Sequence, residues 1–241
     1  MSTLLSKPLA PWLMLISRSV LFILAQAVIA LVLVATGSAA PWYAAAGWWN
    51  FMAIFANVAS IFLLVYAYRL EGMRYLDILR FRREGWGMDL LYLLATIVIG
   101  LPLAAIPMNI LGGILFNDPL IPVHMMFRPL PMWAFILSFL FPLTIAFAEL
   151  PTYFGYAMPR LADQLKNGWL AWVLASFFLG LQHSFLPLIF DGRFFFWRAG
   201  AYMLFAFFTG LMLKLRPSLL PYAVIIHALA DVSAVLVYLS L

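Results

Sequence analysis

The sequence predicts an all-α fold, a polytopic membrane bundle of about seven transmembrane helices with one amphipathic helix in the membrane interface. Of its 241 residues, 66% are hydrophobic and only 10% are charged, whereas a soluble globular domain has about 45–50% apolar and about 25% charged residues. The apolar residues also form runs that match the roughly 20 residues needed to cross a bilayer core. Composition and run length together indicate an integral membrane protein.

Seven apolar runs account for the predicted spans. The first run is longer than the core of an ordinary signal peptide and leads into a second apolar run, so we interpret it as a retained span. The sixth run is the shortest. In chain order, the predicted spans lie at roughly 20–36, 43–68, 89–112, 132–158, 169–189, 199–213 and 219–240.

The segment 71–89 is the most charged part of the chain. Its sequence, "EGMRYLDILRFRREGWGMD", interleaves charged and apolar residues, a pattern typical of a helix that lies in the membrane interface. We interpret it as a segment that fixes topology and contacts anionic lipid headgroups, with substrate docking as the alternative.

The distribution of basic residues predicts the orientation. With a cytoplasmic N-terminus, 11 of the 14 Lys and Arg residues would lie on the cytoplasmic side, as the positive-inside rule requires. The same bias explains the net charge of +5 without nucleic acid as a partner. The predicted cytoplasmic residues are Lys7, Arg18, Arg69, Arg74, Arg80, Arg82, Arg83, Arg160, Lys166, Lys214 and Arg216, and those outside this set are Arg128, Arg193 and Arg198.

Four ionisable residues lie inside predicted spans, namely Glu149, His183, His227 and Asp231. Such groups cost roughly 2.5–3.5 kcal/mol on insertion scales and normally face the bundle interior or a wet cavity. Counted from the nearest basic residue of the predicted cytoplasmic side, at about 1.5 Å per residue, all four reach the middle layer of the bilayer. Their shared depth on three spans predicts one buried polar site.

Local spacing adds two expectations. His227 and Asp231 are at i and i+4 and should share a helix face. Pro151 lacks the donor that would bond the carbonyl of Phe147, so the helix should open beside Glu149 and admit water. Taken singly, each His is also compatible with a simple interhelical hydrogen bond, and a lone buried Glu with a protonated carboxyl group. Tyr153 and Tyr156 read as packing residues and interface anchors.

Three motifs in the second half of the chain belong together. They are "GYAMPRL" (155–161) with Glu149 upstream, "LGLQH" (179–183) and "HALAD" (227–231). Their order and spacing resemble the CPBP family of intramembrane glutamic endopeptidases, which includes CAAX prenyl proteases and bacteriocin-processing proteins. The resemblance covers roughly 130–241. The chain departs from the family's EExxxR motif, because Leu150 and Phe154 stand where the family has its second Glu and its Arg.

The resemblance implies one membrane domain, 1–241, in which helices and the interfacial segment of 1–130 precede a catalytic core at 131–241. It implies that Glu149, near His183, activates water to cleave a hydrophobic or lipidated peptide, while His227 stabilises the oxyanion. Asp231 would orient His227 or be protonated. Membrane lipids are the expected surroundings, and the bacterial cytoplasmic membrane is the expected location.

Other interpretations stay open. Two His and two carboxylates can also bind zinc, although the resemblance implies a metal-independent reaction with no cofactor. The absence of cysteine excludes thiolate ligands, disulfides and cysteine nucleophiles. The main alternative to an enzyme is a catalytically inactive membrane partner, such as an immunity or assembly protein. A proton-coupled transporter is the third possibility, which the lack of matching half-repeats disfavours.

Overall fold

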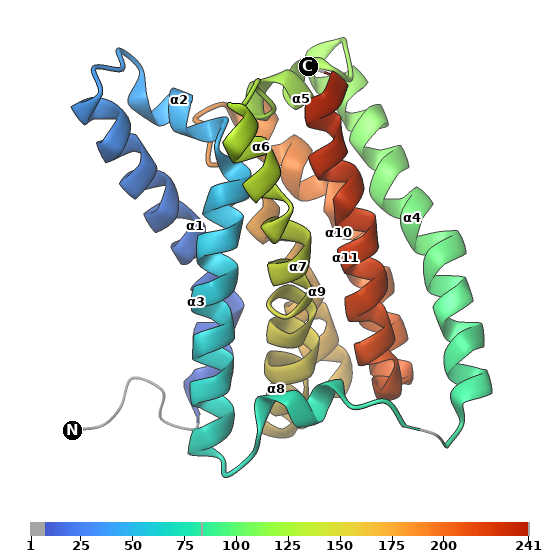
Figure 1. Cartoon of the computed structure of the whole chain (residues 1–241). Coiled ribbons are helices and arrows are strands. Elements are labelled where there is room, and N and C mark those ends of the chain that lie inside the picture. Colours follow the sequence, from blue (N-terminus) through green and yellow to red (C-terminus); the bar gives the residue numbers. More distant parts are fainter. Residues whose placement is uncertain (1–7, 83, 241) are drawn as a thin grey trace.

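The computed structural model describes residues 8–82 and 84–240, and within these ranges every regular element is a helix (Figure 1). In this part of the chain, six helices are long and apolar enough to cross a membrane. The predicted all-α membrane bundle is confirmed, and the expected count of about seven spans is close. The six are α1 (Ala10–Ala35), α3 (Trp49–Leu70), α4 (Trp86–Phe116), a composite helix (Met132–Leu165), α10 (Gly192–Leu215) and Pro217–Leu239, which contains α11 (Leu220–Leu236).

The remaining predicted span, 169–189, is shorter than expected. It is α9 (Gly168–Gln182), whose 15 residues rise about 22 Å, less than the roughly 30 Å of a bilayer core. A 3-10 turn, η3 (His183–Phe185), follows it, because Pro187 disfavours helix at the residue before it. The next helix, α10, begins at Gly192 rather than 199, so Arg193 and Arg198 lie in a helix and not in a loop.

The composite helix opens where the sequence predicts. It consists of α6 (Met132–Ser138), α7 (Leu140–Ala146), the π-helical segment η2 (Pro151–Ala157) and α8 (Met158–Leu165). Pro151 offers no N–H to the carbonyl of Phe147, and the Tyr75 hydroxyl donates to that carbonyl instead. The break places Glu149 between α7 and η2. The hydroxyl of Tyr75 replaces the backbone hydrogen bond that Pro151 cannot make.

The predicted amphipathic helix over 71–89 is corrected to a much shorter element. Among the described residues of this segment, a five-residue 3-10 helix, η1 (Tyr75–Leu79), forms before α4 begins at Trp86, and η1 crosses one end of the bundle (Figure 1). Gly72 and Gly85 have φ near +74° on either side of it, a conformation that interrupts a helix and favours glycine. Two residues of the predicted cytoplasmic set, Lys7 and Arg83, lie outside the described residues.

The first helix is longer than predicted, which overturns the placement of Arg18. Since α1 begins at Ala10, Arg18 lies more than two turns inside it and is fully buried. The apolar run resumes only after this residue, so hydropathy alone put it at the cytoplasmic edge. Its burial is possible because other helices supply its polar partners.

The bundle is least tightly packed on the side of α4. Helix α4 packs along α10, and α11 packs along α7, while α4 stands at the edge of the bundle (Figure 1). Only 6% of the most apolar 18-residue window of α4 is buried inside the bundle, less than for any of the other five spans. The short helices α2 (Pro41–Ala46) and α5 (Ile121–Met126) lie at the end of the bundle opposite η1.

Candidate functional site

Glu149 is buried at the centre of a polar network, with 2% of its surface exposed. Its Oε2 accepts a hydrogen bond from Gln182 Nε2 at 2.7 Å and lies 3.7 Å from Arg18 Nη2. Its other oxygen, Oε1, has no hydrogen-bond partner among the described residues. One oxygen of the carboxylate is therefore held by a hydrogen bond, and the other faces His227 Nε2 at 3.4 Å.

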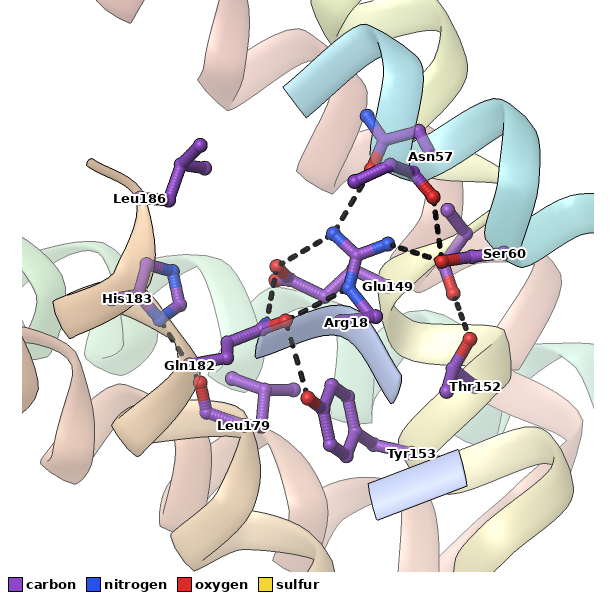
Figure 2. A network of polar contacts seen from close by, with 12 residues as sticks. Arg18, Asn57, Ser60, Glu149, Thr152, Tyr153, Leu179, Gln182, His183 and Leu186 are labelled. Atoms are coloured by element: carbon purple, nitrogen blue, oxygen red, sulfur yellow. Dashed lines mark hydrogen bonds and ion pairs between the residues drawn. The ribbon is translucent and has the colours of Figure 1, made fainter. Parts of the chain in front are cut away.

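Arg18 ties three helices to this carboxylate (Figure 2). Its Nε donates to Gln182 Oε1 at 2.8 Å, and its Nη2 donates to Asn57 Oδ1 at 2.9 Å. A longer bond of 3.4 Å joins Nη1 to Ser60 Oγ. Because α1, α3 and α9 each contribute to the network, the guanidinium is held in one place beside Glu149.

His227 and Asp231 share a face of α11, as their spacing predicts. His227 Nε2 lies 3.0 Å from Asp231 Oδ2 and 3.4 Å from Glu149 Oε1. An ionised carboxylate only accepts hydrogen bonds, so this ring nitrogen is expected to carry a hydrogen. Asp231 keeps 24% of its side chain exposed, which gives the histidine a partly solvated counter-charge.

His183, the first residue of η3, has different contacts from His227. Its Nδ1 is 2.9 Å from the carbonyl oxygen of Leu179, which can only accept, so Nδ1 is the donor. Its ring stacks on Tyr202 with centroids 4.0 Å apart. No hydrogen bond or ion pair joins His183 to Glu149 within the part of the chain that the structure describes. A neutral His183 then presents Nε2 as an acceptor, the opposite of His227.

All four residues predicted from sequence line one cavity of about 540 Å³. Apolar side chains make up most of its wall, and α4 and α11 contribute many of them, among others Ile97, Leu101, Met108, Ile226 and Ala234. Helix α4 packs mainly on α10 and helix α11 mainly on α7. Because both α4 and α11 also line the cavity, it lies between them. The arrangement combines an apolar chamber with a carboxylate and two imidazoles.

A metal site is not apparent in this geometry. Among the described residues, no group of three or more His, Cys, Asp or Glu side chains is arranged to hold a metal ion. His183 is committed to a backbone carbonyl through one nitrogen and to Tyr202 through its ring face. Metal independence stays a prediction, since the four residues share a cavity.

Sequence reasoning missed several residues of the site. In the sequence analysis, Arg18 is placed at the cytoplasmic edge, and Gln182 has no role beyond its place in the motif that ends at His183. Tyr153 was expected to serve packing, yet its hydroxyl donates to Gln182 Oε1 at 3.2 Å. The available signal was that Arg18 and Gln182 are long polar side chains within otherwise mostly apolar stretches, which in a membrane protein predicts a buried partner.

Comparisons with family models, with curated proteins and with solved structures gave no match for this chain.

Proposed function

We propose that this chain is an intramembrane endopeptidase in which Glu149 activates water to cleave a hydrophobic or lipidated peptide. The observation that carries the proposal is the meeting of Glu149 Oε1 and His227 Nε2, 3.4 Å apart, on the wall of an apolar cavity. The first group is a proton acceptor without a hydrogen-bond partner, and the second is a donor. Hydrolysis of an amide needs both.

The reaction follows from these two groups. Glu149 Oε1 takes a proton from water, and the water oxygen bonds to the peptide carbonyl carbon. The carbonyl oxygen gains the negative charge and accepts the hydrogen of His227 Nε2 in place of Asp231, which lies 3.0 Å from that nitrogen. The C–N bond then breaks, and Glu149 returns the proton to the departing amine. His183 is suited to orient the water, because its Nε2 is left as an acceptor.

Arg18 supplies a positive charge where the resembled family has an arginine four residues C-terminal to its second Glu. In this chain Phe154 occupies that position and is buried, while Arg18 of α1 reaches Glu149 from another helix. The guanidinium thus gives the carboxylate that acts as base a positively charged neighbour. The family assignment is therefore compatible with the loss of the Arg and the second Glu.

The membrane placement of the reaction is also a proposal. Basic residues gather at the end of the bundle that contains η1 and the end of α8 (Figure 1), where Arg216 also donates to the carbonyl oxygen of Gly85. The positive-inside rule then makes that end cytoplasmic, with the cytoplasmic membrane of a bacterium as the location. The substrate would enter between α4 and α11.

A second function is favoured by one feature of the same site. Glu149 is 2% exposed and engaged by Gln182 and Arg18, as expected for a polar group that only joins helices. A non-catalytic membrane partner, such as an immunity or assembly protein, would need no more than this.

One comparison separates the two functions. Membranes from cells that express the wild type, Glu149→Gln or Asp163→Asn would be analysed for new peptide termini by mass spectrometry. Asp163 is exposed on α8 and controls for the loss of a carboxylate. We expect termini that are present with the wild type and Asp163→Asn and absent with Glu149→Gln. Identical termini in all three samples would refute the endopeptidase and favour the partner.

A further inference from the structure

Arg198 is a second buried arginine in the bundle, and its contacts leave its charge uncompensated. It lies on α10 with 4% of its surface exposed. Its Nη2 donates to the carbonyl oxygen of Leu186 at 3.0 Å, and its Nε has no hydrogen-bond partner among the described residues. The guanidinium also lies 5.1 Å from the Tyr202 ring centroid.

The two carboxylates of the cavity already face other basic side chains. Glu149 faces Arg18 and His227, and Asp231 faces His227. Within the described ranges, no Asp or Glu lies within 4 Å of the Arg198 guanidinium nitrogens. A buried charge is expensive unless it is paired. The carbonyl of Leu186 and the rings of Tyr202 and Trp197 offer the guanidinium only partial compensation.

The position of Arg198 relates this charge to the cavity. Arg198 and Tyr202 are at i and i+4 on α10, so they share a face, and both line the cavity together with His183. Tyr202 stacks on His183, which fixes the ring beside the guanidinium. The charged group thus lies in the wall of an otherwise mainly apolar chamber.

We propose that Arg198 forms an anion-binding subsite for the oxyanion of an amphiphile, a carboxylate or a phosphate, whose apolar chain lies in the cavity. Guanidinium pairs with both anions through charge-assisted hydrogen bonds. The apolar walls contributed by α4 and α11 bury the chain. This subsite goes beyond peptide hydrolysis, because it needs Arg198 and the cavity but not the base Glu149.

Binding is tested in the Glu149→Gln background, so that the result does not depend on turnover. Purified protein in a neutral maltoside detergent would be melted with dodecanoate, dodecyl phosphate or dodecanol at equal concentration. A ligand that binds the folded state raises the melting temperature. We expect at least one anion to bind at least about tenfold more tightly than dodecanol, a difference of about 1.4 kcal/mol. The anion with the larger shift identifies the source as a carboxylate or a phosphate.

Two variants assign the effect to the guanidinium. Arg198→Gln should remove the preference for the anion, whereas Arg193→Gln, on the same helix but exposed, should keep it. Arg198→Lys retains the charge without the planar fork and should bind the anion several-fold more weakly, which provides a second reading if Arg198→Gln does not fold. Either of two results would overturn the proposal. One is equal binding of dodecanol and both anions to the protein that retains Arg198, and the other is an undiminished preference for the anion in Arg198→Gln.

Discussion

Arg18 of α1 and Glu149 of the composite helix form an ion pair in the interior of the bundle, with Nη2 3.7 Å from Oε2. Both side chains are almost completely buried, although they are 131 positions apart in the chain. The pair joins the first membrane helix to the break beside Pro151. Helix packing and the position of the candidate base therefore depend on the same contact.

Arg18→Gln should destabilise the fold by about 3–5 kcal/mol, because Glu149 would keep a buried charge without its partner. Glu149→Gln should destabilise the fold less, because Arg18 keeps its hydrogen bonds to Gln182 and Asn57. The double variant should lose less stability than the two single losses added together, since it buries no unpaired charge. Unfolding in mixed micelles measures all three free energies. Strictly additive losses would show that the two residues are not energetically coupled.

His227→Gln should lower the rate of peptide cleavage by about 10²–10³ if His227 donates to the oxyanion. Binding of the peptide should change little, so the effect falls on kcat rather than KM. Cleavage of a fluorogenic peptide identified from the new termini provides the measurement. His124→Gln, an exposed position on α5, is the matched control. Full turnover in His227→Gln would remove His227 from the mechanism.

Tyr75→Phe should destabilise the protein by about 1–3 kcal/mol, because the carbonyl of Phe147 would lose the hydroxyl that satisfies it. Tyr66→Phe, at an exposed position of α3, should be nearly neutral. Adding Pro151→Ala should recover part of the loss, since the new N–H can bond the same carbonyl. Thermal melting compares the variants. A double variant no better than Tyr75→Phe would contradict this account of the break.

The contribution of Tyr75 should not vary with pH across the neutral range. Burial raises the pKa of the Tyr75 hydroxyl above its usual value, so the folded protein keeps the phenol protonated and donating. Stability gained from this proton is present below the ordinary tyrosine pKa of about 10 and is lost only as the pH rises through the higher folded value. The difference between the wild type and Tyr75→Phe should be constant from about pH 6 to pH 9. A difference that shrinks below pH 9 would contradict the assignment.

Water should reach the cavity beside His227. The chain contains no cysteine, so Ala230→Cys introduces a single thiol on the cavity wall, while Ala206→Cys places one in the packed core, where exposure is 0%. A small water-soluble maleimide reacts with the thiolate, which forms only where water is present. We expect Ala230→Cys to be labelled and Ala206→Cys to stay unreacted, as read by mass spectrometry. Equal protection of both thiols would describe a dry cavity.

Local patterns in the sequence were enough to predict the class of fold and the residues that are costly in a membrane. Composition and run length are sums over neighbouring residues, so they predicted the helical membrane bundle, and spacing along one helix predicted the shared face of His227 and Asp231. The opening at Pro151 was equally local, because it depends on an N–H that proline lacks. Each of these properties is decided within a few turns of the chain.

Which polar groups meet depends on how the helices pack against one another. Hydropathy put Arg18 at the membrane edge and Arg198 in a loop, and it gave Gln182 no role. The length of α1, the short α9 and the early start of α10 bring these three side chains into the bundle. A buried polar group is stable only with partners, and those partners come from other helices. Long-range packing therefore selected the surroundings of Glu149.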